Sequence, residues 1–191
     1  MPSLYVSAEL FAWQLRQLSD AGFSSAPLGD LQPSEVAASP RVAITFDDGS
    51  RTLMRHALPV LQETGFRAIV YLVAGALGGT NHWDVSAFGE AVDPLMDETE
   101  VREWLAAGHS IGAHTITHPR LTRIPADQAR SEIADSRRRL EDRFGVAIEH
   151  FCYPYGKWSK SVRALVEDAG YRTAVTLDGG VNSADTDSLA L

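Results

Sequence analysis

The stretch that decides the fold is VAITFDDG, residues 42–49. It opens with an apolar, mostly β-branched run, which favours a buried strand. Two adjacent carboxylates, Asp47 and Asp48, follow that run, and Gly49 allows the chain to turn there. Adjacent side chains on an extended strand point to opposite sides, but at this turn both acids can reach one cleft. Because neighbouring carboxylates repel each other at neutral pH, the pair requires a counter-charge, and a divalent metal is the simplest one.

Apolar segments alternate with amphipathic segments along the rest of the chain. After the strand that carries the acid pair, the pattern predicts strands at 68–73, 110–113, 150–153 and 172–177, and helices at 7–22, 52–64, 100–107, 126–143 and 159–169. This alternation indicates a parallel sheet covered by helices, either open or closed into a barrel. The stretches 47–48, 114–118 and 153–155 all follow predicted strands, and the carboxyl ends of barrel strands form active sites.

Several local features refine this scheme. Ser7 is the expected N-cap of the first helix, and Thr99 or Asp97 is the expected cap of the helix at 100–107. Pro59 predicts a kink or an early break in the second helix. Residues 23–40 and 75–94 are expected to be connections, and the tail 178–191 to be polar and turn-rich.

The helix at 126–143 carries an arginine run, residues 137–139. We interpret this run as a solvated helix face. Its expected partners at i,i±3/4 spacing are Glu132, Asp135, Glu141 and Asp142.

Length, composition and charge indicate a single-domain protein and argue against a nucleic-acid-binding or membrane-spanning one. The chain has 191 residues and a formal net charge of −8, so we expect one domain over 1–191, with its core at about 41–177, and no nucleic-acid partner. No apolar run approaches the ~20 residues that a membrane span needs. The single cysteine, Cys152, allows no intramolecular disulfide, and the first residues show no signal-peptide pattern. These features favour a cytoplasmic location, and they are equally consistent with a fragment of a longer secreted or anchored protein.

A second polar stretch, HTITH at residues 114–118, also follows a predicted strand. On a helical turn, its spacing places His114 and His118 on one side. Two imidazoles and one carboxylate suit a Zn²⁺-type ion and leave positions open for water and substrate. The histidine pair and the acid pair, each after an apolar strand, together predict a metal site.

Three motifs in this order resemble those of a known family. The segments TFDDG at 45–49, HTITHP at 114–119 and FCYPYG at 151–156 are similar to the three signature motifs of the polysaccharide deacetylases, the NodB-homology family of carbohydrate esterases. The third has the Tyr-Pro-Tyr-Gly form of one branch. The resemblance implies an α/β fold, a distorted (β/α) barrel with about seven strands, incomplete at the ends in this chain.

The resemblance also implies a reaction and a role for each motif residue. The activity would be metal-dependent hydrolysis of N-acetyl groups on an N-acetylated sugar polymer or oligomer, a hydrolase reaction on a non-peptide carbon–nitrogen bond. Asp48, His114 and His118 would bind one divalent ion, most simply Zn²⁺, with Co²⁺ or Ni²⁺ as alternatives. Asp47 would be the general base, and a backbone N–H near Tyr155 would contact the oxyanion.

Aromatic residues near these motifs are candidates for contact with the carbohydrate substrate. Trp83 in the long loop is one candidate, because aromatic faces suit the C–H faces of sugars. The remaining candidates are Tyr153, Pro154 and Tyr155. His82, beside Trp83, is the internal candidate for a second acid, since no Leu-x-His motif of the kind that supplies the acid in many family members occurs in this sequence. The motifs do not identify the sugar or the oligomeric state.

The third motif departs from the common family pattern at Cys152, where many members carry the arginine that orients the base. Asp47 must therefore be held in another way. Two alternatives stay open beside the deacetylase: an amidohydrolase acting on a small linear or cyclic amide, and a catalytically impaired carbohydrate-binding domain. An open groove lined with aromatic residues would favour sugars, and a closed pocket would favour small amides.

Overall fold

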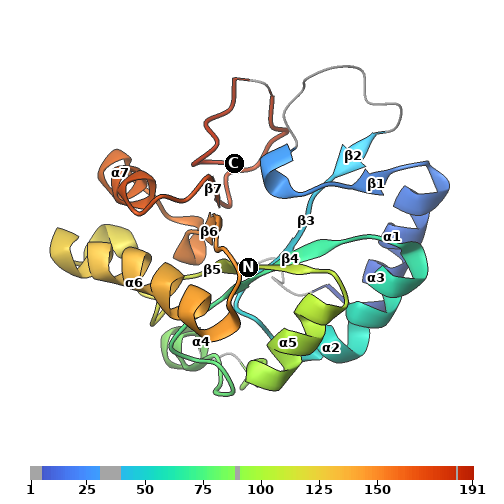
Figure 1. Cartoon of the computed structure of the whole chain (residues 1–191), viewed down its shortest axis with the longest axis horizontal. Helices are drawn as coiled ribbons and strands as arrows, with labels where there is room; N and C mark the ends of the chain where they lie inside the picture. Colours follow the sequence, from blue (N-terminus) through green and yellow to red (C-terminus); the bar gives the residue numbers. More distant parts are fainter. Residues whose placement is uncertain (1–5, 31–39, 89–90, 184) are drawn as a thin grey trace.

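The fold is built on one curled sheet of five parallel strands. The computed structural model describes residues 6–30, 40–88, 91–183 and 185–191. The strand order is β3-β4-β5-β6-β7, with bounds Ile44–Phe46, Ala68–Leu72, Ser110–Ala113, His150–Cys152 and Thr173–Val175. The sheet forms a half-barrel with helices around its outer side (Figure 1). This confirms the expected fold class, a distorted (β/α) barrel, and each of the five predicted strands is present within two residues of its predicted bounds.

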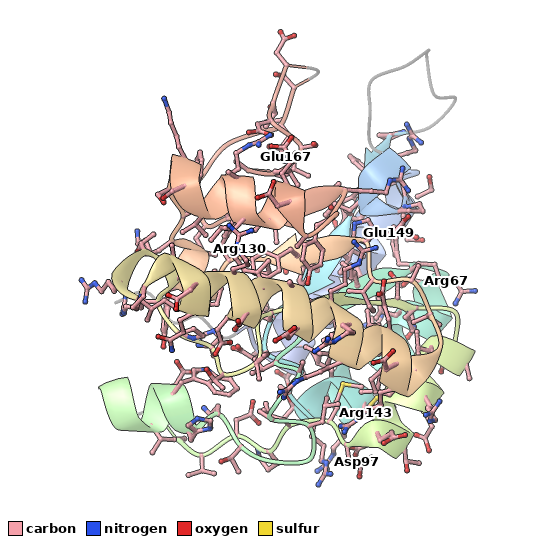
Figure 2. The ribbon with its side chains drawn as sticks, turned by 60° about the vertical axis from the view of Figure 1, so that its left-hand side comes forward. Arg67, Asp97, Arg130, Arg143, Glu149 and Glu167 are labelled. Atoms are coloured by element: carbon pink, nitrogen blue, oxygen red, sulfur yellow. The ribbon has the colours of Figure 1, made fainter. Side chains whose placement is uncertain are left out.

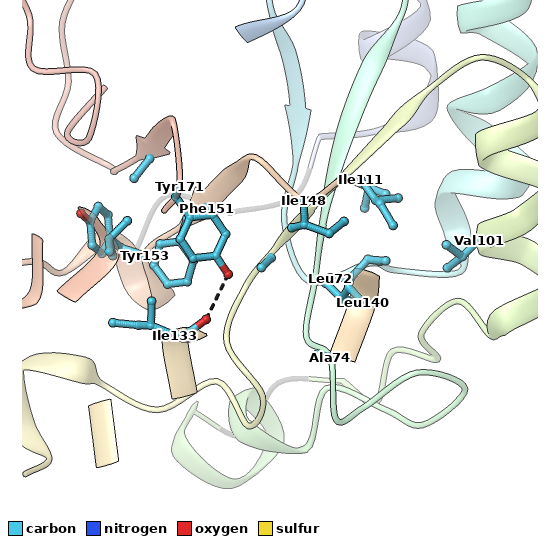
Figure 3. Packing of buried hydrophobic residues seen from close by; sticks show 14 of the residues in the cluster. Leu72, Ala74, Val101, Ile111, Ile133, Leu140, Ile148, Phe151, Tyr153 and Tyr171 are labelled. Carbon is cyan, nitrogen blue, oxygen red and sulfur yellow. Dashed lines mark hydrogen bonds between the residues drawn. The ribbon is translucent and has the colours of Figure 1, made fainter. Parts of the chain in front are cut away.

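The strand register separates two faces. Ile44 pairs with Ala68, Ile69 with Ser110, and Cys152 with Val175. Because side chains alternate along a strand, one set points outward under the helices and the other into the half-barrel. The outward set joins the main core, which includes Val70, Ala113 and Ala174. Leu72, Ile111 and Phe151 of the same set are labelled in Figure 3.

The inner face holds a smaller cluster formed by Ile69, Tyr71 and Cys152. A Cβ on Gly112 would lie 2.6 Å from the Tyr71 ring, so only glycine at that position of β5 leaves room for the ring. Asp47 and His114 continue the inward-pointing series at the carboxyl ends of β3 and β5. The inner face therefore becomes polar toward the edge where the strands end.

Most helices lie close to their predicted positions. The observed bounds are α1 Ala8–Asp20, α2 Thr52–His56, α3 Leu58–Thr64, α4 His82–Phe88, α5 Glu98–Ala106, α6 Ala126–Phe144 and α7 Lys160–Asp168. The Ser7 side chain caps α1 by accepting a hydrogen bond from Leu10 N, as predicted. The expected helix at 52–64 breaks at Ala57, because Pro59 begins a new helix in its first turn. The cap of α5 is Asp97, which forms a capping box with Glu100.

Two expected connections contain more structure than their composition indicated. Residues 75–94 include helix α4, and Ser24–Ser25 (β1) and Arg41–Val42 (β2) form a small parallel pair flanking a short 3-10 turn. The polar tail returns along the sheet, where Ala174 N donates to Ser188 O and Leu191 N donates to Ala174 O. Leu189 is thereby buried in the main core, so the tail covers the open side of β7.

The outer surfaces of the helices carry charged side chains, among them Arg130 on α6 and Glu167 on α7 (Figure 2). Part of the arginine run behaves as expected, since Arg137 pairs with Glu141 at 3.0 Å and Arg138 with Asp135 at 3.1 Å. Among the residues that the structure describes, no helix is both long enough and apolar enough to cross a membrane.

Candidate active site and metal centre

A cleft of ≈ 530 Å³ opens where the carboxyl ends of β3, β5 and β6 meet. Its lining includes both predicted acids and both predicted histidines, together with Tyr155 from the third motif. The turn after β3 requires Gly49, whose φ is +83° and whose added Cβ would lie 2.7 Å from Leu72. The three sequence motifs therefore meet in one cleft, as expected from their positions after parallel strands.

Asp48, His114 and His118 form a compact group of three potential metal ligands. Asp48 Oδ1 lies 3.6 Å from His114 Nε2 and 3.4 Å from His118 Nε2, and the two Nε2 atoms are 3.1 Å apart. Ligand atoms bound tetrahedrally to Zn²⁺ at about 2.0–2.1 Å are separated by about 3.3 Å, so the observed spacing fits such an ion. Two nitrogens and one oxygen also leave a coordination position for water.

The orientation of His114 is set by the third motif. Its ring is only 1% exposed, and Nδ1 lies 2.8 Å from the backbone oxygen of Cys152. Since a carbonyl oxygen can only accept, Nδ1 carries the proton and Nε2 keeps its lone pair for a metal. The backbone of β6 thus selects the tautomer that a metal site needs.

His118 is held by ring contacts. Trp83 stacks on it with a centroid distance of 4.7 Å, and Tyr155 approaches edge-on at 4.6 Å. Its backbone N donates to Thr115 Oγ1 at 3.0 Å. The ring is therefore fixed by packing on both sides, and its Nδ1 is buried without a hydrogen-bond partner in the described part of the chain.

Glu132 on α6 holds the loop between the two histidines. Its Oε2 accepts hydrogen bonds from Ile116 N at 2.8 Å and Thr117 N at 3.0 Å, and its Oε1 accepts one from Thr117 Oγ1 at 2.6 Å. The residue is 7% exposed. This corrects its expected role as a surface partner of the arginine run, since the carboxylate points inward to the loop between the two histidines.

Backbone strain gathers at the same place. Among the described residues, the non-glycine positions with positive φ are Asp48 at 66°, Thr115 at 66°, His118 at 60° and Tyr155 at 59°. Such conformations are costly for residues with a Cβ and persist where the surrounding structure imposes them. All four belong to the three motifs, so the strained backbone conformations of non-glycine residues are concentrated at this cleft.

Burial shifts the pKa values of Asp48 and His118 toward their neutral forms. It raises the pKa of Asp48 to about 6, an effect that His114 partly offsets and that Asp47, Asp84 and Asp93 reinforce. Burial also lowers the pKa of His118 to about 2, so the imidazole stays neutral, which is the form that binds metal. Asp48 Oδ1 is buried without a hydrogen-bond partner among the described residues, and a cation between these ligands would satisfy it.

Asp47 lies outside the group formed by Asp48 and the two histidines. Its side chain is exposed to the cleft, and the Cys152 thiol donates a weak hydrogen bond to Asp47 Oδ1 with an S···O distance of 3.4 Å. The thiol thus contacts the carboxylate that an arginine orients in many family members. The Asp47 carboxylate is exposed to the cleft, within which a general base could accept a proton.

The structure does not bring the other predicted substrate contacts to the cleft wall. Tyr153 is fully buried and its hydroxyl donates to Leu189 O at 2.9 Å, and Pro154 is also buried. Trp83 is 6% exposed and packs with Val73 and Leu95. These rings are covered by protein, so only Tyr155 of this set lines the cleft, where the Arg120 guanidinium lies 4.2 Å from its ring centre.

Other lining residues were not identified from sequence. Asn81, Asp84 and Asp93 form one side, and an apolar side comes from Val6, which precedes α1, and from Phe11 on α1, Ile44 on β3 and Leu53 on α2. Asn81 connects the two ends of its loop by bonding Ala91 O and Asp93 N. Their acidic and amide types are common in loops, so no sequence signal separated them from ordinary turn residues. His82 is exposed beside Trp83.

Comparison with known proteins places this geometry in a family. Residues 35–174 match the family model described as polysaccharide deacetylase. Bacillus subtilis YxkH, which bears a polysaccharide deacetylase name, is 28% identical over 99% of this chain and 64% of its own length. A chitooligosaccharide deacetylase of Azorhizobium caulinodans is 35% identical over 69% of this chain and 55% of its own length. The chain thus spans less than two thirds of either relative.

A solved structure agrees with the fold. The Streptococcus pyogenes deacetylase PplD, in complex with acetate, superposes with a TM-score of 0.84 at 24% identity, and the match covers 100% of this chain and 81% of PplD. The family match includes all three motifs that meet in the cleft. The chain belongs to the polysaccharide deacetylase family.

Proposed function

We propose that this chain hydrolyses N-acetyl groups of an N-acetylated carbohydrate, releasing acetate and a free amine. The observation that carries the proposal is the convergence of Asp48, His114 and His118 beside a carboxylate, Asp47, that the ligand group does not need. The names of the chitooligosaccharide and polysaccharide deacetylase relatives agree with this reaction. We also propose that the chain belongs to the branch of the family with a Tyr-Pro-Tyr-Gly third motif, which residues 153–156 support.

Asp48, His114 and His118 would hold one divalent ion, and their mixed nitrogen and oxygen donors favour Zn²⁺, with Co²⁺ and Ni²⁺ as substitutes. When bound, the ion supplies an acidified water and polarises the acetyl carbonyl. Asp47 accepts the proton of the attacking water at its carboxylate. The peptide N–H of Tyr155, which lines the cleft beside His118, stabilises the oxyanion.

The decisive experiment compares Asp47→Asn with wild type. We expect acetate release from N-acetylglucosamine oligomers to be abolished while bound metal remains at one equivalent, because the base is lost and the ligands are kept. Asp142→Asn, on the exposed side of α6, is the matched control and should retain activity. Full activity of Asp47→Asn would refute the assignment of the base.

A second candidate is an amidohydrolase acting on a small linear or cyclic amide. The apolar side of the cleft, with Val6, Phe11 and Leu53, favours it, as does the burial of Trp83, which removes one expected sugar platform. The same assay with small N-acyl amides distinguishes the two reactions. Turnover of the amides without turnover of any N-acetylated glycan would favour the amidohydrolase.

A further inference from the structure

A second set of potential ligands overlaps the first. Asp47, His114 and Cys152 each offer one ligand atom, and these atoms all lie within 4.8 Å of one another. Cys152 Sγ and Asp47 Oδ1 are 3.4 Å apart. A sulfur and an oxygen bound tetrahedrally to one ion, at about 2.3 and 2.0 Å, are separated by about 3.5 Å, so this pair already has the spacing of two ligands.

The two sets share one residue, His114. His114 Nδ1 is occupied by the backbone oxygen of Cys152 at 2.8 Å, which leaves Nε2 as the atom available to either set. One lone pair cannot serve two ions at once. A metal therefore binds either with Asp48 and His118 or with Asp47 and Cys152, and the softness of the ion decides between them, since thiolate ligands select soft ions.

The buried cluster around Cys152 contains a tyrosine hydroxyl group. The side chain is 4% exposed and packs with Tyr71, which is fully buried on the inner face of the sheet. The Tyr71 hydroxyl has no hydrogen-bond partner among the described residues. A buried hydroxyl in the same cluster as Cys152 is the kind of donor that supports a metal-bound thiolate, and outer groups of this kind tune metal affinity.

We propose that Asp47, His114 and Cys152 form a second metal-binding mode, specific for soft divalent cations such as Cd²⁺, that excludes the hydrolytic mode. On binding, the sulfur forms a bond to the ion and the thiol proton leaves to solvent, with no change of oxidation state. The carboxylate of Asp47 becomes a ligand in this mode. A soft ion bound in this way should inhibit hydrolysis, and this consequence rests on the proposed function, in which Asp47 is the base. The binding mode itself does not depend on the proposed function.

The test is titration of the metal-free protein with Cd²⁺ alone, followed by the ultraviolet charge-transfer absorption of the cadmium–thiolate bond. Because Cys152 is the only cysteine, this signal reports on one sulfur. We expect one equivalent of signal in wild type and in Asp48→Asn, and none in Cys152→Ser. Absence of the signal in wild type, or its loss in Asp48→Asn, would overturn the proposal.

A second readout measures inhibition. With Co²⁺ as the activating ion, the concentration of Cd²⁺ that halves acetate release should rise at least about tenfold in Cys152→Ser, since a ligand is lost. Cys152→Ala provides a second variant, and circular dichroism confirms that both are folded. Equal Cd²⁺ sensitivity of wild type and both variants would contradict the proposal. If no acetate is released at all, the proposed function fails, and the absorption titration still tests the binding mode.

Discussion

The two ends of β5 carry histidines in contrasting environments. His109 directly precedes the strand and His114 directly follows it, and both are nearly inaccessible to solvent. At the amino end, the His109 ring lies against Trp104 with a centroid distance of 4.3 Å, and its Nδ1 accepts a hydrogen bond from Ala68 N at 3.3 Å. At the carboxyl end, Nε2 of His114 points to Asp48 and His118.

This comparison shows which properties distinguish the candidate metal site from an ordinary buried histidine. Burial lowers the pKa of His109 to about 4 and that of His118 to about 2, so both imidazoles are neutral at physiological pH. A buried neutral histidine is therefore not diagnostic. The carboxyl end differs because a carboxylate converges on the imidazoles and the backbone at Thr115 and His118 is strained.

The largest expected difference between the two ends is in metal binding. His118→Ala should lose the bound ion, and acetate release should fall by about 10³-fold, because the ion supplies several kcal/mol of transition-state stabilisation. His109→Gln should keep one equivalent of metal and most of the activity. Metal analysis and acetate release on the same samples check this. If His109→Gln lost the metal and His118→Ala kept it, the assignment of the metal site to the carboxyl end of β5 would be wrong.

A smaller effect is expected from the support of the carboxyl end. Glu132→Ala removes three hydrogen bonds from the loop between His114 and His118, so metal affinity should fall about 10–100-fold. Glu132→Gln can keep all three contacts, because its amide oxygen accepts from the two backbone N–H groups and its amide nitrogen donates to the Thr117 hydroxyl. Isothermal titration with Zn²⁺ measures both affinities.

Asp142→Ala, an exposed change on the same helix, is the control for this series. It should bind Zn²⁺ as wild type does. If Glu132→Gln is as weak as Glu132→Ala, the negative charge of Glu132, rather than its hydrogen bonds, supports the loop. If neither differs from wild type, the loop holds its shape without α6.

The carboxyl end could be predicted from sequence to the extent that local patterns determine it. An apolar run followed by Asp47 and Asp48, and another followed by His114, place these residues at strand ends whatever the rest of the chain does. The parallel order of the strands then brings the motifs together. The strand positions and the positions of the four motif residues were therefore predictable from short segments.

The rest depends on contacts between distant segments. Glu132 has the spacing of a partner for the arginine run, and only the packing of α6 against the histidine loop turns it inward. The residue type of Trp83 makes it a candidate sugar contact, whereas its position in helix α4 places it on His118. Sequence periodicity describes one segment at a time, so it does not show which distant segments will contact each other.

The charge of the site should lower the stability of the metal-free protein. Asp48 is about two thirds buried, and the rise of its pKa to about 6 means that its ionised form is disfavoured in the folded state at neutral pH. Asp48→Asn should therefore raise the free energy of unfolding of the metal-free protein by about 2 kcal/mol. Urea unfolding in the presence of a chelator measures this. An unchanged or lower value would show that the buried carboxylate is already compensated.

The amino end of β5 provides the smallest expected effect, a dependence of stability on pH. The pKa of His109 is about 4 in the folded state, below the ordinary value of 6.5, so between these values the unfolded chain binds more protons. The free energy of unfolding should therefore fall as pH is lowered, by about 1 kcal/mol between about pH 7 and about pH 5.5 from this residue. His109→Gln removes this contribution, so urea unfolding of the metal-free variant should show a slope smaller by that amount. Since His118 adds a slope of the same sign in both proteins, only the difference reports on His109, and identical slopes would show that His109 becomes protonated in the folded protein at its ordinary pKa.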